Sequence, residues 1–366
     1  MQQLSSLQAV RAIAAIFVVV FHINIYFLPE RLYNGESAVE LFNIGYAGVE
    51  FFFALSGFIM VYIHQKDIGT PEKVSRFALK RVLRIYPLYW VVLTAFILAM
   101  WFVPSIGASL DPTTLEYAHN YSLFPVHTGM MLEVAWTLQY EMLFYIAFGL
   151  LIFTKRFGLI AMGIWFSACA ITLFRPIENS VFAMLLSPNN LIFLCGMLSA
   201  LYFKRLQAID SYLVVASGLA IFFAIGIADL NKTFPLNEGW RTLGFGIGAS
   251  LTIMGLVAGE AFGKIKSPAW LNRIGDSSYA LYLVHLPVLM VFSILVSKLG
   301  LNTLIGPLPM LIVFTIGSVI AGLVTHYLIE KPLIKLTQRL FFNSSASGQV
   351  PIVKVFHPPL HPSERP

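Results

Sequence analysis

Long apolar runs separated by short polar segments dominate the pattern of this 366-residue chain. A helix of about 20 apolar residues crosses a bilayer, and ten runs approach that length. They predict an all-α polytopic membrane protein with about ten transmembrane helices. The stretch from Pro104 to Glu133 leaves room for a re-entrant segment. The ten runs cover residues 7–28, 45–64, 82–103, 136–153, 158–175, 184–203, 212–230, 242–259, 278–297 and 305–328.

The two ends of the chain differ in character. Ser5 and Ser6 are possible caps for the first helix, which lacks the basic segment and cleavage site of a signal peptide and is expected to be retained. The stretch after Phe342 is rich in Ser and Pro. We therefore expect a transmembrane domain over residues 1–340 and a disordered cytoplasmic tail over residues 341–366.

The composition excludes a soluble globular domain. Apolar residues make up 58% of the chain and charged residues only 11%, against roughly 25% charged residues in soluble domains. Cys169 and Cys195 lie within apolar runs. Neither a disulfide framework nor a metal site is therefore predicted.

The formal net charge of +6 is interpreted as a topology signal. Basic residues occur in short clusters between apolar runs and form no single patch, so no nucleic-acid partner is predicted. If the N-terminus is cytoplasmic, most of the 24 Lys and Arg residues fall in inner loops or in the C-terminal tail. The positive-inside rule then predicts that both termini are cytoplasmic.

Arg11 and His22 are ionisable residues within the first apolar run. Being eleven residues apart, they lie about 20° apart around a helix and about 16 Å apart along it. Intramembrane ionisable residues are costly; they mark functional sites or pair to hold helices together. An imidazole on the same face as a guanidinium favours chemistry at His22.

Glu50 and Glu141 each lie a few residues into a helix that enters from the outside on this topology. Both are therefore expected at the depth of His22. A carboxylate beside an imidazole fixes its tautomer and stabilises the imidazolium. The alternative is that either glutamate only hydrogen-bonds a neighbouring helix.

Arg81 and Arg84 stand three residues apart, so they project from one helix face. Two guanidiniums at this spacing suit phosphate groups, which accept forked hydrogen bonds. The positive-inside rule alone would also place arginines here.

His285 lies partway across its span, beside Pro287, and is either a ligand contact or a hydrogen-bond partner between helices. His64, His326 and Glu330 lie near the inner interface, where we expect solvated or structural roles. The other polar groups predict a column across the membrane that favours group transfer from a phosphate-bearing cytoplasmic ligand. From inside outward it contains Arg11, Arg81 and Arg84, then His285, then His22, Glu50 and Glu141.

Six motifs, in order between residues 4 and 333, resemble the acyltransferase-3 family of integral-membrane acyltransferases. The resemblance implies ten or eleven membrane helices and transfer of an acyl group, often acetyl, from cytoplasmic acyl-CoA to a sugar hydroxyl of a surface polysaccharide or its lipid-linked precursor. It is nearest in kind to the branch that decorates bacterial exopolysaccharide, and so implies a bacterial inner membrane. The motifs are LQAVRAIAAIFVVVFH, GVEFFFALSGFIM, FALKRVLRIYPLYW, AWTLQYEMLFY, IGDSSYALYLVHLP and HYLIEKP.

The resemblance also implies roles for the column. His22 would be the general base on the acceptor hydroxyl, and Glu141 would orient His22 or the acceptor. No tightly bound cofactor is expected, because acyl-CoA serves as co-substrate. Arg81 and Arg84 would hold the CoA phosphates, Arg11 and His285 would line the donor channel, and Glu50 would contact the carbohydrate acceptor.

Other functions are compatible with the same residues. A covalent acyl-histidine relay is the mechanistic alternative to direct transfer. A transporter or flippase for a glycan or acylated glycan intermediate is the alternative class, although the internal repeat of many transporters is missing. The sequence does not predict an oligomeric state.

Overall fold

The computed structural model describes residues 4–102, 113–124, 129–177, 181–232 and 237–342. Across these residues every regular element is helical, and nine stretches are long and apolar enough to cross a bilayer. The fifth predicted run forms a 17-residue helix, α7, at the lower end of the length needed to cross. The polytopic helical fold is therefore confirmed. The nine stretches are Ser5–Arg31, Glu40–Asp67, Pro71–Phe102, Glu133–Phe153, Phe182–Arg205, Asp210–Leu230, Glu238–Ala261, Ser278–Lys298 and Pro307–Phe342.

The last helix reaches Phe342, so residues 341 and 342 of the predicted tail are helical. The rest of that tail lies outside the described residues. In chain order the helices are α1 (Ser5–His22), α2 (Leu28–Arg31), α3 (Gly48–His64), α4 (Val74–Phe102), α5 (Thr114–Ser122), α6 (Trp136–Phe153), α7 (Lys155–Ile171), α8 (Val181–Leu185), α9 (Asn189–Tyr202), α10 (Ala208–Leu230), α11 (Glu238–Ala261), α12 (Ala269–Asp276), α13 (Ser278–Lys298), α14 (Pro307–Thr325) and α15 (Lys331–Phe342).

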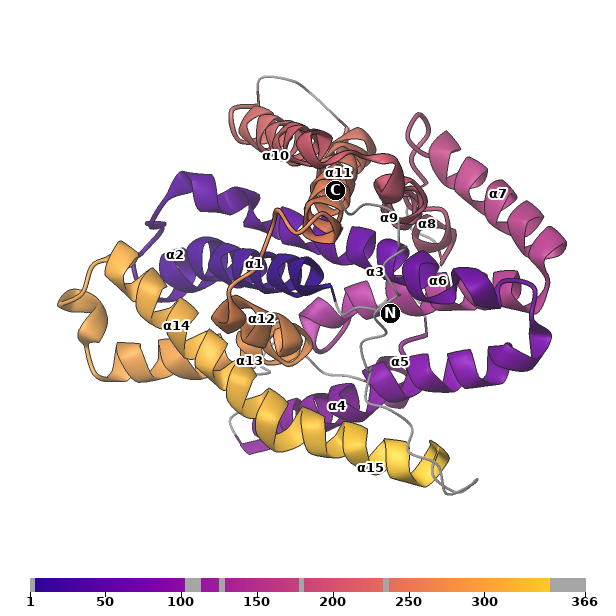
Figure 1. The fold of residues 1–366 in the computed structure, drawn as a ribbon. Coiled ribbons are helices and arrows are strands. Elements are labelled where there is room, and N and C mark those ends of the chain that lie inside the picture. Colours follow the sequence, from indigo (N-terminus) through magenta and orange to yellow (C-terminus); the bar gives the residue numbers. More distant parts are fainter. Residues whose placement is uncertain (1–3, 103–112, 125–128, 178–180, 233–236, 343–366) are drawn as a thin grey trace.

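Helix α1 occupies the middle of the molecule and packs against α3, α11, α12, α13 and α14 (Figure 1). Ser5 and Ser6 are predicted as caps of this helix, but its N-cap residue is Leu4, whose side chain makes no capping hydrogen bond. The backbone N–H and hydroxyl groups of Ser5 and Ser6 instead donate to the Glu260 carboxylate at 2.5–2.8 Å. A carboxylate is favourable at a helix N-terminus, so α11 fixes the position of α1.

Helices α3 and α9 touch through two glycines. A Cβ atom on Gly57 would lie 2.1 Å from the carbonyl oxygen of Phe193, and one on Gly196 would lie 2.0 Å from that of Ala54. Small residues at such contacts let membrane helices approach closely. Larger side chains would force α3 away from α9.

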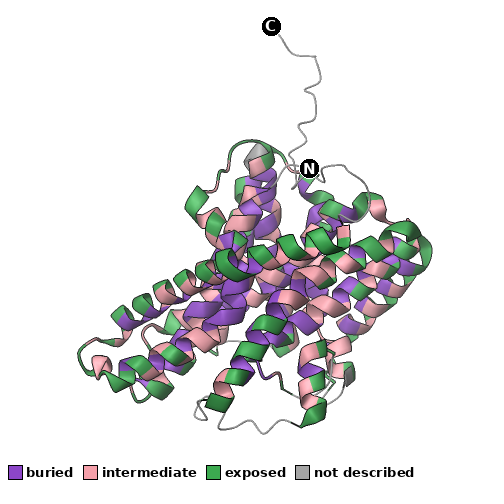
Figure 2. Ribbon diagram, turned by 90° about the horizontal axis from the view of Figure 1, so that it is seen from below, coloured by how far each residue is buried: buried purple, intermediate pink, exposed green. Residues whose placement is uncertain are grey.

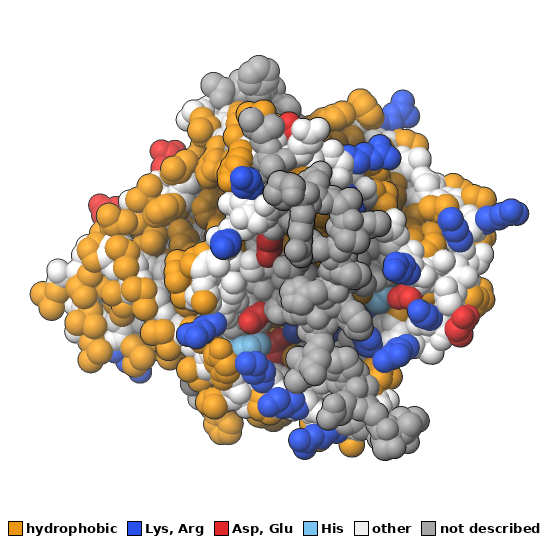
Figure 3. Space-filling view, viewed as in Figure 1, with side chains coloured by type: hydrophobic (Ala, Val, Ile, Leu, Met, Phe, Trp, Pro, Cys, Tyr) orange, Lys and Arg blue, Asp and Glu red, His pale blue; other side chains and the backbone are white. Residues whose placement is uncertain are grey.

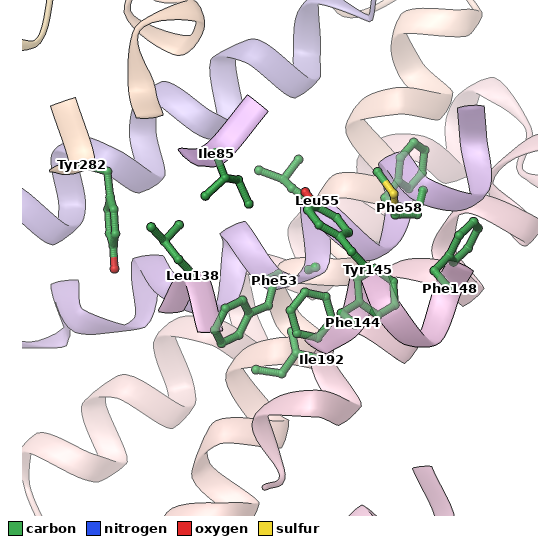
Figure 4. Packing of buried hydrophobic residues seen from close by; sticks show 14 of the residues in the cluster. Phe53, Leu55, Phe58, Ile85, Leu138, Phe144, Tyr145, Phe148, Ile192 and Tyr282 are labelled. Carbon is green, nitrogen blue, oxygen red and sulfur yellow. The ribbon is translucent and has the colours of Figure 1, made fainter. Parts of the chain in front are cut away.

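An aromatic core connects α3, α6 and α9 (Figure 4). Phe144 stacks on Phe193 with ring centroids 4.4 Å apart, and Phe53 lies 4.8 Å from Phe193. Buried positions concentrate in the middle of the bundle, while the outer helices expose many of their residues (Figure 2). Their exposed side chains include Ile160, Ile164, Leu213, Ile316 and Ile320, as expected for lipid-facing surfaces.

Helix α5 docks on the middle of α4. Tyr86, Tyr89 and Trp90 of α4 donate to the carbonyl groups of residues 120–122 at 2.7–2.9 Å. The last carbonyls of a helix have no intrahelical partner. In a membrane such groups must find protein partners, and α4 supplies them.

Candidate active site

A pocket lies between α1, α3, α4, α6 and α13. We call it the arginine pocket, because it brings together Arg11, Arg81 and Arg84 as predicted. Its other lining residues are Val49, Phe52, Phe53, Leu55, Ser56, Ile59, Met60, Ile85, Thr137, Leu138, Glu141, Tyr145, Ser278, Tyr279 and Tyr282.

Arg84 is held by an acid from the far end of the chain. Its Nη1 atom donates to Oε1 of Glu330 at 2.8 Å. The second carboxylate oxygen accepts from Nδ1 of His326 at 2.6 Å, within a π-helical turn, His326–Glu330. Glu330 is only 2% exposed and His326 5% exposed, so the expectation that they are solvated is wrong, and their role as partners of Arg84 fits the structural alternative.

Arg81 makes a different kind of contact. Its Nη2 atom donates to Nε2 of His64 at 3.0 Å, and Nδ1 of His64 donates to Asp67 at 2.8 Å. His64 is buried, at 7% exposed, and is not solvated. The Nε atom of Arg81 is buried without a hydrogen-bond partner among the described residues, so this guanidinium retains an unused donor.

Glu141 lies in the arginine pocket instead of beside His22. It accepts hydrogen bonds from Ser56, at 3.1 Å, and from Tyr145. Tyr145 stands between Glu141 and Arg81, whose guanidinium carbon lies 5.4 Å from the centre of the tyrosine ring. Leu55, Ile85 and Leu138, which Figure 4 labels, are three of the apolar residues that line this pocket.

His22 lines a second pocket, which we call the histidine pocket. Glu50 lines this pocket together with His22. The pocket combines carboxylates, a guanidinium, an amide and aromatic rings, which is the chemistry of a polar, ring-shaped ligand site. It is lined by Val18, Phe21, His22, Tyr26, Tyr46, Val49, Glu50, Glu133, Val134, Trp136, Asn189, Glu238, Arg241, Thr242 and Tyr282.

The contacts of His22 define the tautomer of its neutral ring. Nδ1 lies 2.8 Å from the carbonyl oxygen of Val18. A carbonyl oxygen only accepts, so Nδ1 carries the proton and Nε2 holds a lone pair. The Nε2 lone pair is the feature that a general base requires.

His285 lies behind His22 and lines neither pocket as described. Its Nδ1 donates to the carbonyl oxygen of Tyr282 at 2.8 Å, so its Nε2 is an acceptor when the ring is neutral. That atom lies 3.3 Å from Nδ1 of His22. His285 is fully buried, so this geometry favours support of the His22 ring over contact with the donor.

A π-helical turn, Ile23–Phe27, follows α1 and sets the direction of the chain after His22. Asn24 in this turn is fully buried and binds the next loop, donating to the Val39 carbonyl group at 2.9 Å and to Asn43 at 2.6 Å. Such turns are rare and frequent at functional sites. The end of α1 is therefore fixed on both sides of the histidine.

Glu50 is 6% exposed, and its Oε2 atom has no hydrogen-bond partner among the described residues. Across the same pocket, Asp229 accepts from Tyr46 at 2.7 Å and from Arg241 at 2.9 Å. These two bonds join α10 to α11 and to the segment before α3. Sequence reasoning missed Arg241 and Tyr46; no regular spacing pointed to them.

Two local side-chain pairs of the site did carry a sequence signal. His326 and Glu330 stand four apart within HYLIEKP, and Glu141 and Tyr145 stand four apart within AWTLQYEMLFY. Residues four apart share a helix face. The spacing indicates the two local pairs but not their arginine partners.

The face shown in Figure 3 carries many Lys and Arg side chains, while apolar side chains cover its left edge, where α14 begins. Among the described residues no group of three or more His, Cys, Asp or Glu side chains is placed to hold a metal ion.

Fold and site define an integral-membrane protein whose interior holds one pocket lined by three arginines and a second pocket lined by a histidine. Residues 4–327 match the acyltransferase domain family, and the chain belongs to it. The protein is thus a multi-pass membrane acyltransferase.

Two curated relatives are similar to parts of the chain. The exopolysaccharide production protein ExoZ of Rhizobium meliloti (strain 1021) is 29% identical over 311 residues, which cover 82% of this chain and 93% of the relative. Protein 2 in the picA locus of Rhizobium radiobacter is 31% identical over 115 residues, 31% of this chain and 53% of the relative. No solved structure matches significantly.

Proposed function

We propose that the protein is an O-acyltransferase of the bacterial inner membrane, with both termini in the cytoplasm. It moves an acyl group, acetyl in the simplest case, from cytoplasmic acyl-CoA to a hydroxyl group of exopolysaccharide or of its lipid-linked precursor. The exopolysaccharide assignment is supported by the similarity to ExoZ over most of both chains. The transmembrane domain would comprise residues 1–340, followed by a cytoplasmic tail.

The observation that carries the proposal is the geometry of His22. Its Nδ1–H is bound to the Val18 carbonyl group, which leaves the Nε2 lone pair available to the histidine pocket. Glu50, with an unpaired carboxylate oxygen, lines the same pocket. A sugar ring would find there the aromatic faces and hydrogen-bonding groups that carbohydrates need.

In the proposed reaction, Nε2 of His22 takes the proton of the acceptor hydroxyl while the oxygen attacks the thioester carbon. The carbon–oxygen bond forms, the carbon–sulfur bond breaks, and the proton passes from His22 to the CoA thiolate. The products are an ester and free CoA, so protons and electrons balance. General base catalysis of this kind contributes typically 10² to 10⁴-fold in rate.

Arg11, Arg81 and Arg84 would bind the CoA phosphates from the cytoplasmic side. Guanidiniums form forked, charge-assisted hydrogen bonds with phosphate oxygens, and the unused Nε donor of Arg81 supports this role. Glu141 would position Tyr145 and, through it, Arg81, since it binds Tyr145 and not His22 among the described residues.

Acyl content of the surface polysaccharide, measured by NMR, tests reaction class and acceptor together. Deletion of the gene should remove an acyl signal, the wild-type gene should restore it, and His22→Ala should not, although the variant protein is inserted at normal abundance. Full acylation with His22→Ala would overturn the assignment of His22. An acylated protein isolated with acyl-CoA alone would contradict direct transfer and favour a histidine relay.

A further inference from the structure

The arginine pocket and the histidine pocket are separate, but they have two wall residues in common, Val49 of α3 and Tyr282 of α13. The arginines line only the first pocket, and His22 lines only the second. On the proposed function, an acyl group carried by CoA would cross from one pocket to the other where these two side chains form the shared wall.

Tyr282 is held firmly in this position. Its hydroxyl group lies 3.1 Å from Oγ1 of Thr137 and 3.2 Å from the carbonyl oxygen of Val134, both at the start of α6. Its ring packs edge-on to Phe52, with centroids 5.7 Å apart. The side chain is only 7% exposed, and it extends from α13 with its hydroxyl group at the tip (Figure 4).

Val49, the other shared wall residue, lies on a backbone that is held for a different reason. Its neighbour Gly48 lies against α1, where an added Cβ would be 2.6 Å from the carbonyl oxygen of Ala14. The start of α3 therefore cannot move toward α1. A β-branched side chain on a fixed backbone has few rotamers, so the Val49 side chain has few alternative positions.

We propose that Val49 and Tyr282 form a size filter that admits narrow acyl groups and rejects branched ones. The acyl group enters first, followed by the unbranched cysteamine end of the CoA arm, so the filter acts on the width of the acyl group and not on its length. This inference rests on the proposed function and adds to it the determinant of donor specificity.

Two isomeric acyl donors distinguish selection by the width of the acyl group from selection by its length. Butyryl-CoA and isobutyryl-CoA have the same atoms, but only the second is branched. Inverted membrane vesicles containing the full-length protein and exopolysaccharide acceptor from the deletion strain would receive each labelled donor below saturation. The measured quantity is the ratio of butyryl to isobutyryl transfer within one variant, which does not depend on the amount of folded protein.

The wild type should prefer butyryl by at least about tenfold, the scale on which an apolar site discriminates one carbon. Val49→Ala makes the side chain at the shared wall smaller and should lower the ratio at least about fivefold. Tyr282→Phe removes the hydroxyl contacts that fix the ring and should lower it as well. Val61→Ala is the matched control, since Val61 lies buried on the same helix but lines neither pocket, and should keep the wild-type ratio.

A wild-type ratio near one, or equal ratios for Val49→Ala and Val61→Ala, would overturn the filter while leaving the proposed function intact. Loss of acetyl transfer in both filter variants, with activity retained in Val61→Ala, would also overturn it, because both residues would then be needed for catalysis itself. No transfer by the wild type from any donor, acetyl-CoA included, would overturn the proposed function and the filter with it.

Discussion

His285 provides a test of whether the second histidine supports His22 or takes part in the chemistry. The two rings meet through a contact of 3.3 Å, longer than the 2.8 Å bond between His22 and the Val18 carbonyl group. A net hydrogen bond contributes about 0.5–1.5 kcal/mol, and Val18 alone still fixes the ring. If His285 only supports His22, His285→Leu should reduce the acyl-transfer rate about 2- to 13-fold.

Two comparison variants distinguish support of His22 from a direct part of His285 in the chemistry. His22→Ala should lower the rate by 10² to 10⁴-fold, because it removes the base itself. His285→Gln keeps an acceptor near the position of Nε2 and should recover most of the loss caused by His285→Leu. The assay is initial CoA release in inverted vesicles at saturating acetyl-CoA, normalised to inserted protein. A loss in His285→Leu as large as in His22→Ala would refute the supporting role.

Three further predictions concern the fold and the donor site. Glu260→Gln should lower the thermal midpoint of the solubilised protein, since loss of the charge that binds the first turn of α1 costs about 2 kcal/mol; an unchanged midpoint would show that the cap is unimportant. Gly57→Ala should reduce the yield of folded protein through its clash with α9, whereas Gly163→Ala, which meets nothing within 4 Å, should not; equal yields would contradict the close helix contact. Arg84→Gln should raise the KM for acyl-CoA about tenfold, as expected for a lost charge-assisted bond to phosphate, while the exposed Arg76→Gln on the same helix should leave it unchanged; equal KM values would remove Arg84 from the donor site.

The helices could be predicted well because the bilayer imposes a length on every apolar run. The run predicted over residues 136–153 coincides with α6, Trp136–Phe153. The start of α1 could not be predicted in this way, because its cap comes from Glu260, 255 residues away from Ser5. Local pattern reveals which residues can form a helix, but not which distant side chain completes its end.

The position of a residue along its predicted helix did not determine which pocket the residue lines. Glu50 and Glu141 lie at similar distances from the starts of their predicted runs, yet Glu50 enters the histidine pocket and Glu141 the arginine pocket. Helix tilt and side-chain direction decide which pocket a residue enters, and both depend on packing against neighbouring helices. The sequence pattern therefore predicted which residues line the pockets better than it predicted which of them lie together.

The roles of the three arginines in the arginine pocket can be interpreted only from their hydrogen-bond and ion-pair partners. Sequence alone left two explanations for them, the positive-inside rule and ligand binding. Arg84 has a carboxylate partner, Glu330, at 2.8 Å. Among the described residues, Arg11 and Arg81 form no ion pair within 4 Å; Arg11 donates to the hydroxyl group of Ser278 at 3.1 Å and Arg81 to His64. On the proposed function, the phosphates of acyl-CoA would supply the counter-charges that Arg11 and Arg81 lack within 4 Å.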